Sequence, residues 1–187
     1  MDAGGDGPRR ARRDVVVAGA LSFAGVGVLL ALWPFVHQGN PNPGTPRREG
    51  PEVDLMPIRP GQTVLVQWRG KPMLVRHRTV AEIEAARAAD SSGRVDLMAR
   101  NAALPAMAPG LDANRTVAGH AQWLVVVGVC TRDGCVVSVR SDEDAAFFCP
   151  CCASRYDSSG RVRSGPAPQN LAVPPVTFLS PTRLRIG

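Results

Sequence analysis

The sequence has few aromatic residues and only three histidines, His37, His77 and His120. Aromatic residues make up 5% of its 187 residues, whereas glycine and proline contribute 19 and 17 residues. This composition argues against a helical bundle, which would contain fewer residues that interrupt helices, and it favours a β domain rich in loops. The chain is also too short for two ordinary domains, so we expect one domain with an additional segment.

The charge pattern gives no sign of a nucleic-acid partner. The net charge is +6, and outside the N-terminal tail Lys and Arg alternate with acidic residues. A nucleic-acid-binding surface would instead show a basic stripe interleaved with aromatic residues. We therefore expect no nucleic-acid binding and assign most of these charges to a solvated surface.

One long run, residues 15–36, lacks charge altogether. At about 1.5 Å per residue, a helix of this length crosses a hydrocarbon core of roughly 30 Å. Arginines are concentrated before this run, with fewer in the dozen residues after it: Arg9, Arg10, Arg12 and Arg13 against Arg47 and Arg48. The positive-inside rule therefore predicts a cytoplasmic tail at 1–14, a single-pass anchor in the inner (cytoplasmic) membrane at 15–36, and a domain on the periplasmic side. The paired arginines also suit a twin-arginine export signal, and a cleaved signal peptide is the alternative.

Residues 37–55 are rich in proline and glycine and show no apolar periodicity. Such a composition predicts a flexible neck, extended where proline dominates. A neck of this kind would let the domain move relative to its anchor, and a simple spacer is the alternative interpretation.

From Met56 onward the pattern predicts a single domain, 56–187. The β-rich runs TVLVQW and KPMLVRHR are joined by Arg69-Gly70, a hairpin signal. A helix is expected in RTVAEIEAARAA, where Thr79 and Glu82 form a capping-box signature. Residues 90–119 predict mostly loop, with one short helical turn at most.

The remaining segments predict strands. QWLVVVGVC reads as a buried strand that leads to Cys130, and CVVSV, AFFC, SRYD and RVRSG follow as short strands separated by turns. An extended segment and a last strand, RLRIG, finish the chain. The predicted fold class is therefore mainly β, with one inserted helix.

All five cysteines lie in two short loops, CTRDGC at 130–135 and CPCCASRYD at 149–157, and neither loop contains a histidine. Thiols grouped in this way suit disulfides in an oxidising compartment or ligation of a metal. The C-x-x-C spacing of Cys149 and Cys152 is suitable for zinc.

With these two loops, the chain resembles the Rieske iron-sulfur subunit of the ubiquinol:cytochrome c reductase complex, in its bacterial type. That family reads C-T-H-L-G-C and C-P-C-H-G-S in the two loops. The resemblance covers almost the entire chain, including WRGKPMLVRHRT, WLVVVGVCT, YDSSGRVRSGPAPQNLAVP and the terminal LRIG. It implies an antiparallel β-sandwich with a small cluster-binding subdomain, a [2Fe-2S] cluster, and electron transfer from ubiquinol to cytochrome c1. It also implies contacts with the cytochrome b and cytochrome c1 subunits in a dimeric complex.

The resemblance assigns the four ligand positions of the cluster. The two cysteine ligands fall on Cys130 and Cys149, which match, whereas the two histidine ligands fall on Arg132 and Cys152, which do not. Arg132 is a poor ligand because its guanidinium stays protonated and offers no lone pair. Cys152 could bind metal as a thiolate, so the predicted metal-binding set is Cys130, Cys149 and Cys152.

Other positions match the family. The resemblance places an inter-loop disulfide on Cys135 and Cys151. It places hydroxyls that donate hydrogen bonds to the cluster's sulfurs on Ser154 and Tyr156, and the proline loop that shields the cluster on residues 165–168. The scaffold is therefore present, and half of the ligation is missing.

The missing imidazoles matter for the redox potential. Two histidines raise a Rieske potential to roughly −150 to +300 mV, against about −400 mV for all-cysteine ferredoxins. A drop of about 400 mV is close to seven decades in a one-electron equilibrium constant. We find no substitute histidine, because His120 precedes Cys130 by ten residues of predicted strand, about 30 Å in the wrong direction.

Asp133 also departs from the family, which has leucine at this apolar tip where it docks on cytochrome b. Burying an unpaired carboxylate there would cost several kcal/mol. Arg132 beside it could pair with it, which would make the tip an ion-pair surface.

The residues leave three functions open. The first is the family's electron transfer, with Cys130 and Cys149 as iron ligands. The second is a structural or regulatory subunit without a Rieske cluster, whose loops are held by Cys135–Cys151 and by a second bridge among the other thiols. The third is a reassigned site that holds zinc or an all-cysteine cluster.

Overall fold

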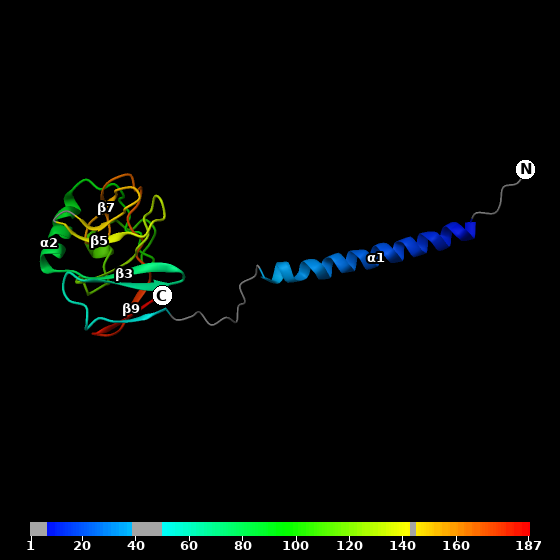
Figure 1. Ribbon diagram of the computed structural model, residues 1–187, viewed down its shortest axis with the longest axis horizontal. Coiled ribbons are helices and arrows are strands. Elements are labelled where there is room, and N and C mark those ends of the chain that lie inside the picture. The colour runs from blue at the N-terminus through cyan, green and yellow to red at the C-terminus, as the bar shows by residue number, and fades with distance from the viewer. Residues whose placement is uncertain (1–6, 39–49, 143–144) are drawn as a thin grey trace, which may run out of the picture. The chain divides into compact units, whose positions relative to one another are not determined.

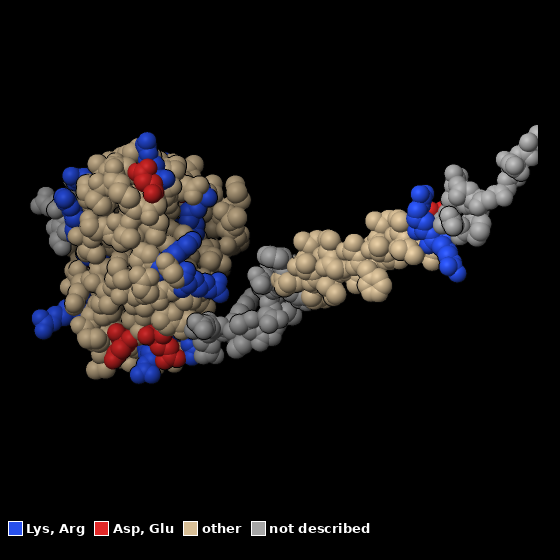
Figure 2. Space-filling model, turned by 45° about the vertical axis from the view of Figure 1, so that its right-hand side comes forward, with Lys and Arg blue, Asp and Glu red and all other residues tan. Residues whose placement is uncertain are grey.

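The computed structural model describes residues 7–38, 50–142 and 145–187, and the chain divides into two units, residues 1–48 and 49–187 (Figure 1). Helix α1 (Gly7–Gln38) forms the first unit and includes the whole predicted anchor. Its segment Arg12–Pro34 is long and apolar enough to cross a membrane, and none of that window is buried inside the protein. Figure 2 shows the charged residues of this stretch gathered at its N-terminal end, with the rest of it uncharged. A helix that is apolar all round suits a lipid environment.

The second unit contains three sheets, with strand orders β1-β10-β9, β2-β3-β4 and β5-β6-β7-β8, and every pair of neighbouring strands in them is antiparallel. The strands are β1 (Glu52–Asp54), β2 (Thr63–Trp68), β3 (Lys71–His77), β4 (Trp123–Val127), β5 (Ser138–Asp142), β6 (Ala145–Phe148), β7 (Arg155–Tyr156), β8 (Val162–Ser164), β9 (Val176–Ser180) and β10 (Arg183–Ile186). The described helical segments of this second unit are α2 (Val80–Ala88) and two short 3-10 turns, η1 (Ala89–Ser91) and η2 (Asp112–Asn114). The mainly β fold with one inserted helix is therefore confirmed.

Strand β3 lies between two layers, with β9 on one side and β5 and β7 on the other in Figure 1. Successive side chains of a strand point to opposite faces. Met73 and Val75 accordingly join the core shared with β1 and β10, whereas Leu74 joins the core that contains Cys130 and Cys149. The central sheet thus provides the apolar floor beneath the thiol loops.

The local sequence signals of this unit are confirmed. Strands β2 and β3 form a hairpin in which Trp68 pairs with Lys71, and Arg69 and Gly70 have φ of 51° and 72°, as a tight two-residue turn requires. Thr79 caps α2 with a capping box. In residues 90–119 we expected mostly loop, with at most one helical turn. The structure has η2 within this segment, and η1 overlaps its start.

The predicted neck, 37–55, differs from the structure at both ends. Its first two residues belong to α1. At its other end β1 pairs with β10, and the side chains of Val53 and Leu55 are buried in the core. Alternating apolar residues give this short segment the one buried face that a strand needs. Residues 39–49 of the predicted neck lie outside the described residues.

Candidate metal centre

Each thiol loop is closed by a pair of backbone hydrogen bonds. In the first loop, Cys130 N donates to Cys135 O over 2.8 Å and Gly134 N donates to Cys130 O over 3.0 Å. In the second, Cys149 N donates to Ser154 O over 2.8 Å and Ala153 N donates to Cys149 O over 2.9 Å. These bonds fix where the thiols point, because they fold both loops into tight turns before any metal is considered.

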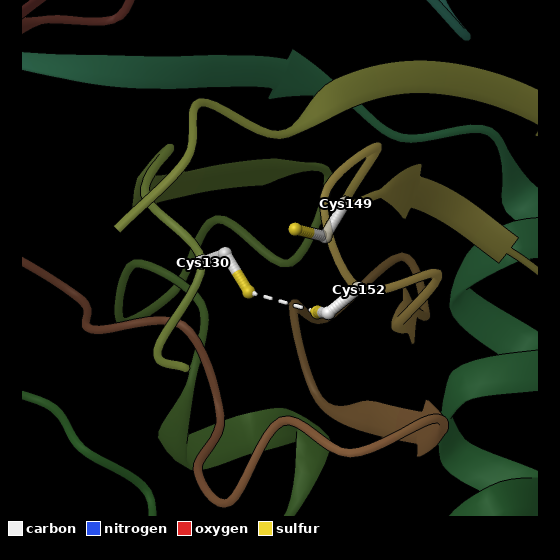
Figure 3. A group of neighbouring side chains, drawn as sticks. All are labelled: Cys130, Cys149 and Cys152. Carbon is white, nitrogen blue, oxygen red and sulfur yellow. Dashed lines mark hydrogen bonds between the residues drawn. The ribbon is translucent and has the colours of Figure 1, made fainter. Parts of the chain in front are cut away.

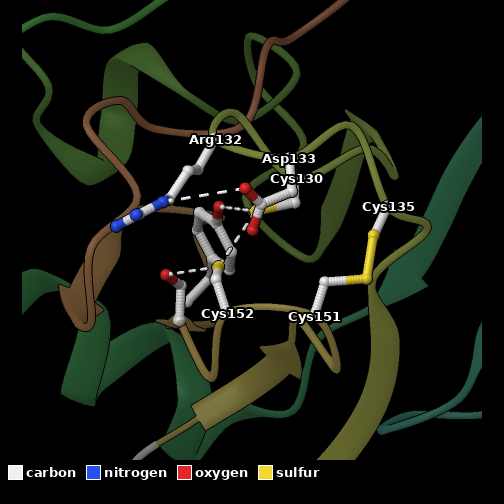
Figure 4. Close-up of a disulfide and its surroundings, with 8 residues drawn as sticks. Cys130, Arg132, Asp133, Cys135, Cys151 and Cys152 are labelled. Atoms are coloured by element: carbon white, nitrogen blue, oxygen red, sulfur yellow. Dashed lines mark hydrogen bonds and ion pairs between the residues drawn. A yellow bond between two sulfur atoms is a disulfide. The ribbon is translucent and has the colours of Figure 1, made fainter.

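A disulfide between Cys135 and Cys151 joins the two loops (Figure 4). The pairing that the family resemblance implied is therefore present in the structure, with the two Cα atoms 6.4 Å apart. It leaves three free thiols, Cys130, Cys149 and Cys152. The bridge restrains the loops against each other, which keeps these thiols close without any metal ion.

The three free thiols converge on one point (Figure 3). Their sulfur atoms all lie within 4.8 Å of one another, and the Sγ atoms of Cys130 and Cys152 are 3.5 Å apart. Cys130 and Cys149 are buried, whereas Cys152 is partly exposed. The structure thus brings together the three residues that the sequence predicted as metal ligands.

Two hydroxyl groups contact the sulfurs. Tyr156 donates a hydrogen bond to Cys130 Sγ at 3.5 Å. Ser154 Oγ lies 3.1 Å from Cys152 Sγ and accepts a hydrogen bond from the backbone N–H of Ala167 at 3.0 Å. Because a hydroxyl group has one proton to give, this arrangement leaves the Ser154 proton available to Cys152. The resemblance assigned these two hydroxyls to the sulfurs of a cluster, and here they contact the thiols of Cys130 and Cys152.

The thiols differ in how easily they ionise. Burial opposes ionisation of Cys130, but hydrogen bonds from the Tyr156 hydroxyl and from the backbone N–H groups of Arg132 and Asp133 outweigh it and lower the pKa to about 7. Burial raises the pKa of Cys149 to about 11, and the neighbouring Cys130 adds to the increase. Burial and Cys130 also raise the pKa of Tyr156, so its hydroxyl keeps its proton. Cys130 is therefore the better preformed thiolate of the two buried cysteines.

Arg132 stands where the family has its first histidine ligand, at the exposed tip of the first loop (Figure 4). Its Nε lies 3.6 Å from Asp133 Oδ1, and the two side chains are 52% and 37% exposed. The ion pair that the sequence suggested at this tip is thus present. A surface pair of this kind stabilises the fold by at most about 1 kcal/mol, and it brings no ligand atom to the thiols.

The predicted proline loop, 165–168, packs on the second thiol loop. Gly165 has a φ of 95°, and a Cβ at this position would lie 2.5 Å from the Cα of Ser154. Only glycine permits so close an approach in this conformation. The contact puts the buried Ala167 amide within reach of Ser154, and so fixes the serine hydroxyl that contacts Cys152.

We expected most charges on a solvated surface, but several of them form a buried ionic network. The carboxylate of Asp112 accepts hydrogen bonds from Arg78 at 2.6 Å and from the Ser159 hydroxyl. Burial opposes the charge of Asp112, but these bonds outweigh it and lower the pKa of the carboxyl group. Arg161 pairs with Asp157 at 2.8 Å just after β7. Burying a charge is costly unless it is paired or hydrogen-bonded, so these residues fix the segment that follows the second thiol loop.

Arg115 is fully buried and donates to backbone carbonyl groups instead of a carboxylate. Its acceptors include the carbonyl oxygens of Ser159 and Leu171, each at 2.6 Å, and those of Ala99 and Gly160. Burial lowers the pKa of its guanidinium to about 10. Arg115 thereby ties together three chain segments, and no local sequence pattern distinguishes it from a surface arginine.

The described histidine side chains lie away from the thiols. His77 stacks on Trp123 with ring centroids 4.2 Å apart, and His120 stacks on Phe178 at 3.8 Å. Both aromatic partners belong to the other core, between the β1-β10-β9 and β2-β3-β4 sheets. Neither ring belongs to the group of side chains gathered at Cys130, Cys149 and Cys152.

A β domain whose two disulfide-linked loops gather buried thiols beneath a proline loop is a Rieske-type domain. Residues 111–175 match the family model described as Rieske [2Fe-2S] domain, and residues 2–42 match the one described as Ubiquitinol-cytochrome C reductase Fe-S subunit TAT signal.

Two relatives named ubiquinol-cytochrome c reductase iron-sulfur subunit match nearly the full chain. The one from Bradyrhizobium diazoefficiens is 45% identical over 94% of this chain and 94% of its own length. The one from Rickettsia felis is 47% identical over 94% of this chain and 93% of its own length. The chain therefore belongs to the family of ubiquinol-cytochrome c reductase iron-sulfur subunits. A solved structure titled Hyperthermophilic respiratory Complex III aligns with a TM-score of 0.47 and 24% identity, covering 90% of this chain and 98% of that chain.

The family implies a [2Fe-2S] cluster, and the residues present do not fit the Rieske type. That cluster needs two thiolates on one iron and two imidazoles on the other. The site offers three thiols and, at the remaining ligand position, the guanidinium of Arg132. An all-cysteine cluster needs four thiolates, and the disulfide withholds Cys135 and Cys151.

Proposed function

We propose that this chain is a membrane-anchored structural subunit of a ubiquinol-cytochrome c reductase complex, held against its cytochrome b and cytochrome c1 subunits. The observation that carries the proposal is the extent of the identity, which spans 94% of this chain and 94% of a relative with that name. The match includes both the apolar helix and the β domain, and a subunit of a membrane complex needs both.

The proposed topology follows from α1. Residues 1–14 would form the cytoplasmic tail, 15–36 the anchor in the inner membrane, and the domain would lie on the periplasmic side. The arginines before the apolar run support this orientation, and the match of residues 2–42 to an export-signal model supports passage of the domain across the membrane. A periplasmic, oxidising location also suits the Cys135–Cys151 bridge.

The donor set is the reason for proposing a structural role. Electron transfer from ubiquinol to cytochrome c1 is the second candidate, and the retained Cys130, Cys149, Ser154 and Tyr156 favour it. However, a cluster without imidazole ligands would have a reduction potential of about −400 mV, which is too low for a quinol to reduce it usefully. The geometry therefore supports a subunit that keeps the scaffold and lacks the Rieske couple.

The test is purification of the tagged full chain from its own membranes in a mild detergent. We expect haem b and haem c to co-purify with it, and the low-temperature electron paramagnetic resonance spectrum after reduction to lack a Rieske signal. Recovery of the chain without either haem would refute membership of the complex. A Rieske signal would instead establish electron transfer as the function.

A matched pair of anchor variants controls the purification. Leu21→Arg places a charge within the apolar helix, which costs about 2.5–3.5 kcal/mol on insertion scales, so haem recovery should fall sharply. Ser22→Ala lies one residue away and removes only a hydroxyl that donates to Ala18 O within the helix. It should leave haem recovery unchanged.

A further inference from the structure

We propose that Cys130, Cys149 and Cys152 bind a single thiophilic metal ion, such as Zn²⁺, in place of the family's cluster. The inference concerns only the thiol site, and it stands whether or not the chain assembles with cytochromes. It starts from the observation that three free thiols have their sulfur atoms within 4.8 Å of one another.

The spacing of the sulfurs suits one ion. Zinc binds thiolates at about 2.3 Å in a tetrahedral arrangement, which places neighbouring sulfurs about 3.8 Å apart. The Sγ atoms of Cys130 and Cys152 are 3.5 Å apart, and all three fall within 4.8 Å, so a change of at most about 1 Å in any sulfur–sulfur distance completes the geometry. The C-x-x-C spacing of Cys149 and Cys152 is common in zinc sites.

The number of donors excludes two irons. A [2Fe-2S] cluster needs four protein ligands, and the bridge between Cys135 and Cys151 leaves three thiols. Three sulfurs and one position open to water fit a mononuclear site, and the opening lies on the side of Cys152, which is the only one of the three that is not buried. Thiolate ligands select ions such as Zn²⁺ and Cu⁺ over Mg²⁺ or Ca²⁺.

The surroundings suit the charge that such a site would carry. Three thiolates and a divalent ion leave one net negative charge, which must be stabilised where it is buried. The hydroxyl of Tyr156 donates to Cys130, and that of Ser154 faces Cys152. Such donors around the ligand atoms orient them and typically raise metal affinity 10–100-fold.

The alternative use of these thiols is a second disulfide, since Cys130 and Cys152 are close enough for oxidation to join them. That reaction would remove two electrons and two protons and would leave Cys149 as a single thiol, which could not hold an ion alone. The two outcomes are therefore chemically distinct and can be separated by counting free thiols.

The experiment uses the full chain, purified in detergent without oxygen and without added reductant. Metal content is measured first, and the chain is then stripped with a chelator and titrated with Zn²⁺ alone. Alkylation followed by mass spectrometry reports which thiols react. We expect one ion per chain, protection of Cys130, Cys149 and Cys152 from alkylation, and an intact Cys135–Cys151 bridge. X-ray absorption should show three sulfurs at about 2.3 Å from zinc.

Two variants test the assignment. Cys152→Ser should weaken Zn²⁺ binding at least about 100-fold, because it removes a direct ligand. Ser138→Ala, just after the first loop, removes only the hydrogen bond from an exposed hydroxyl to Phe148 O, so its affinity should stay within about fivefold of the native chain. An intact bridge in both variants shows that the loops still fold.

Several results would overturn the proposal. They are two irons with acid-labile sulfide, a second disulfide among the three thiols, an absence of protection by Zn²⁺, and equal Zn²⁺ affinity in Cys152→Ser. Copper bound singly by the same three residues would support it, since the proposal concerns the class of ion. Haem recovery is read out separately, so membership of the complex is tested independently of the metal site.

Discussion

Ala153 has a backbone conformation that disfavours alanine, and replacing it with glycine should stabilise the protein. Its φ is 56°, and its N–H donates to Cys149 O at 2.9 Å, so this conformation closes the second thiol loop. The resembled family reads glycine at this position. The left-handed region costs an L-residue about 1–2 kcal/mol, whereas the extra freedom that glycine loses on folding costs about 0.5–1 kcal/mol. Ala153→Gly should therefore raise the free energy of unfolding by about 0.5–1 kcal/mol.

Thermal unfolding of the full chain in detergent, followed by near-ultraviolet circular dichroism, measures the change. For a domain of this size, about 1 kcal/mol corresponds to a shift in Tm of about 2–4 °C, so we expect a rise of about 1–3 °C. Ala85→Gly is the matched control, because Ala85 is exposed in the middle of α2. There the same chemical change should lower stability by about 1 kcal/mol.

The opposite signs of the two substitutions make the comparison decisive. If Ala153→Gly lowered Tm as Ala85→Gly does, residue 153 would not be held in the left-handed region, and the loop would have another shape. The positions of Cys149 and Cys152 would then also be in doubt, because the bond from Ala153 N to Cys149 O closes the turn between them.

Three further predictions concern the ligands and the buried network. The double variant Arg132→His with Cys152→His supplies both imidazoles, so it should gain a Rieske signal with a potential between roughly −150 and +300 mV. The single variant Arg132→His should show no such signal. A double variant without the signal would mean that the scaffold no longer accepts the cluster. Arg115→Met removes the donor for four buried carbonyl groups and should lower the free energy of unfolding in urea by about 3–5 kcal/mol, whereas the exposed Arg59→Met should change it by less than about 0.5 kcal/mol. The folded-state pKa of Asp112 is lowered, so its contribution to stability is present above the unfolded pKa of about 4 and is lost as the pH falls through the folded value. Asp112→Asn should therefore give a less stable protein whose stability depends less on pH below about pH 4, and an unchanged acid profile would contradict this.

The parts of the fold that the sequence predicts are those with local signals. The Arg69-Gly70 turn joins two runs of strand-forming residues, and the Thr79–Glu82 capping box lies within a single turn of helix. An uninterrupted apolar run is sufficient to predict helix α1. In the site, the disulfide and the ligand positions came from a family pattern whose residues lie in two short loops.

The parts that the sequence misses depend on partners far along the chain. Arg115 bonds to carbonyl oxygens that are 16, 44, 45 and 56 residues away, and nothing beside it in sequence marks it as buried. Likewise, β1 is a short segment next to a proline-rich stretch, and its partner β10 lies at the opposite end of the chain. Tertiary pairing decides such cases, because local propensity is a weak prior.

The placement of the substitutions explains how this chain can keep the family's fold while its ligands differ. Backbone hydrogen bonds, the Cys135–Cys151 bridge and the close contact of Gly165 with Ser154 shape the thiol loops. Arg132 contributes nothing to that framework, since its side chain is half exposed and pairs with its neighbour. Cys152 is smaller than a histidine, and its sulfur lies 3.5 Å from that of Cys130. Changes at this edge therefore alter the donor atoms at little cost in stability.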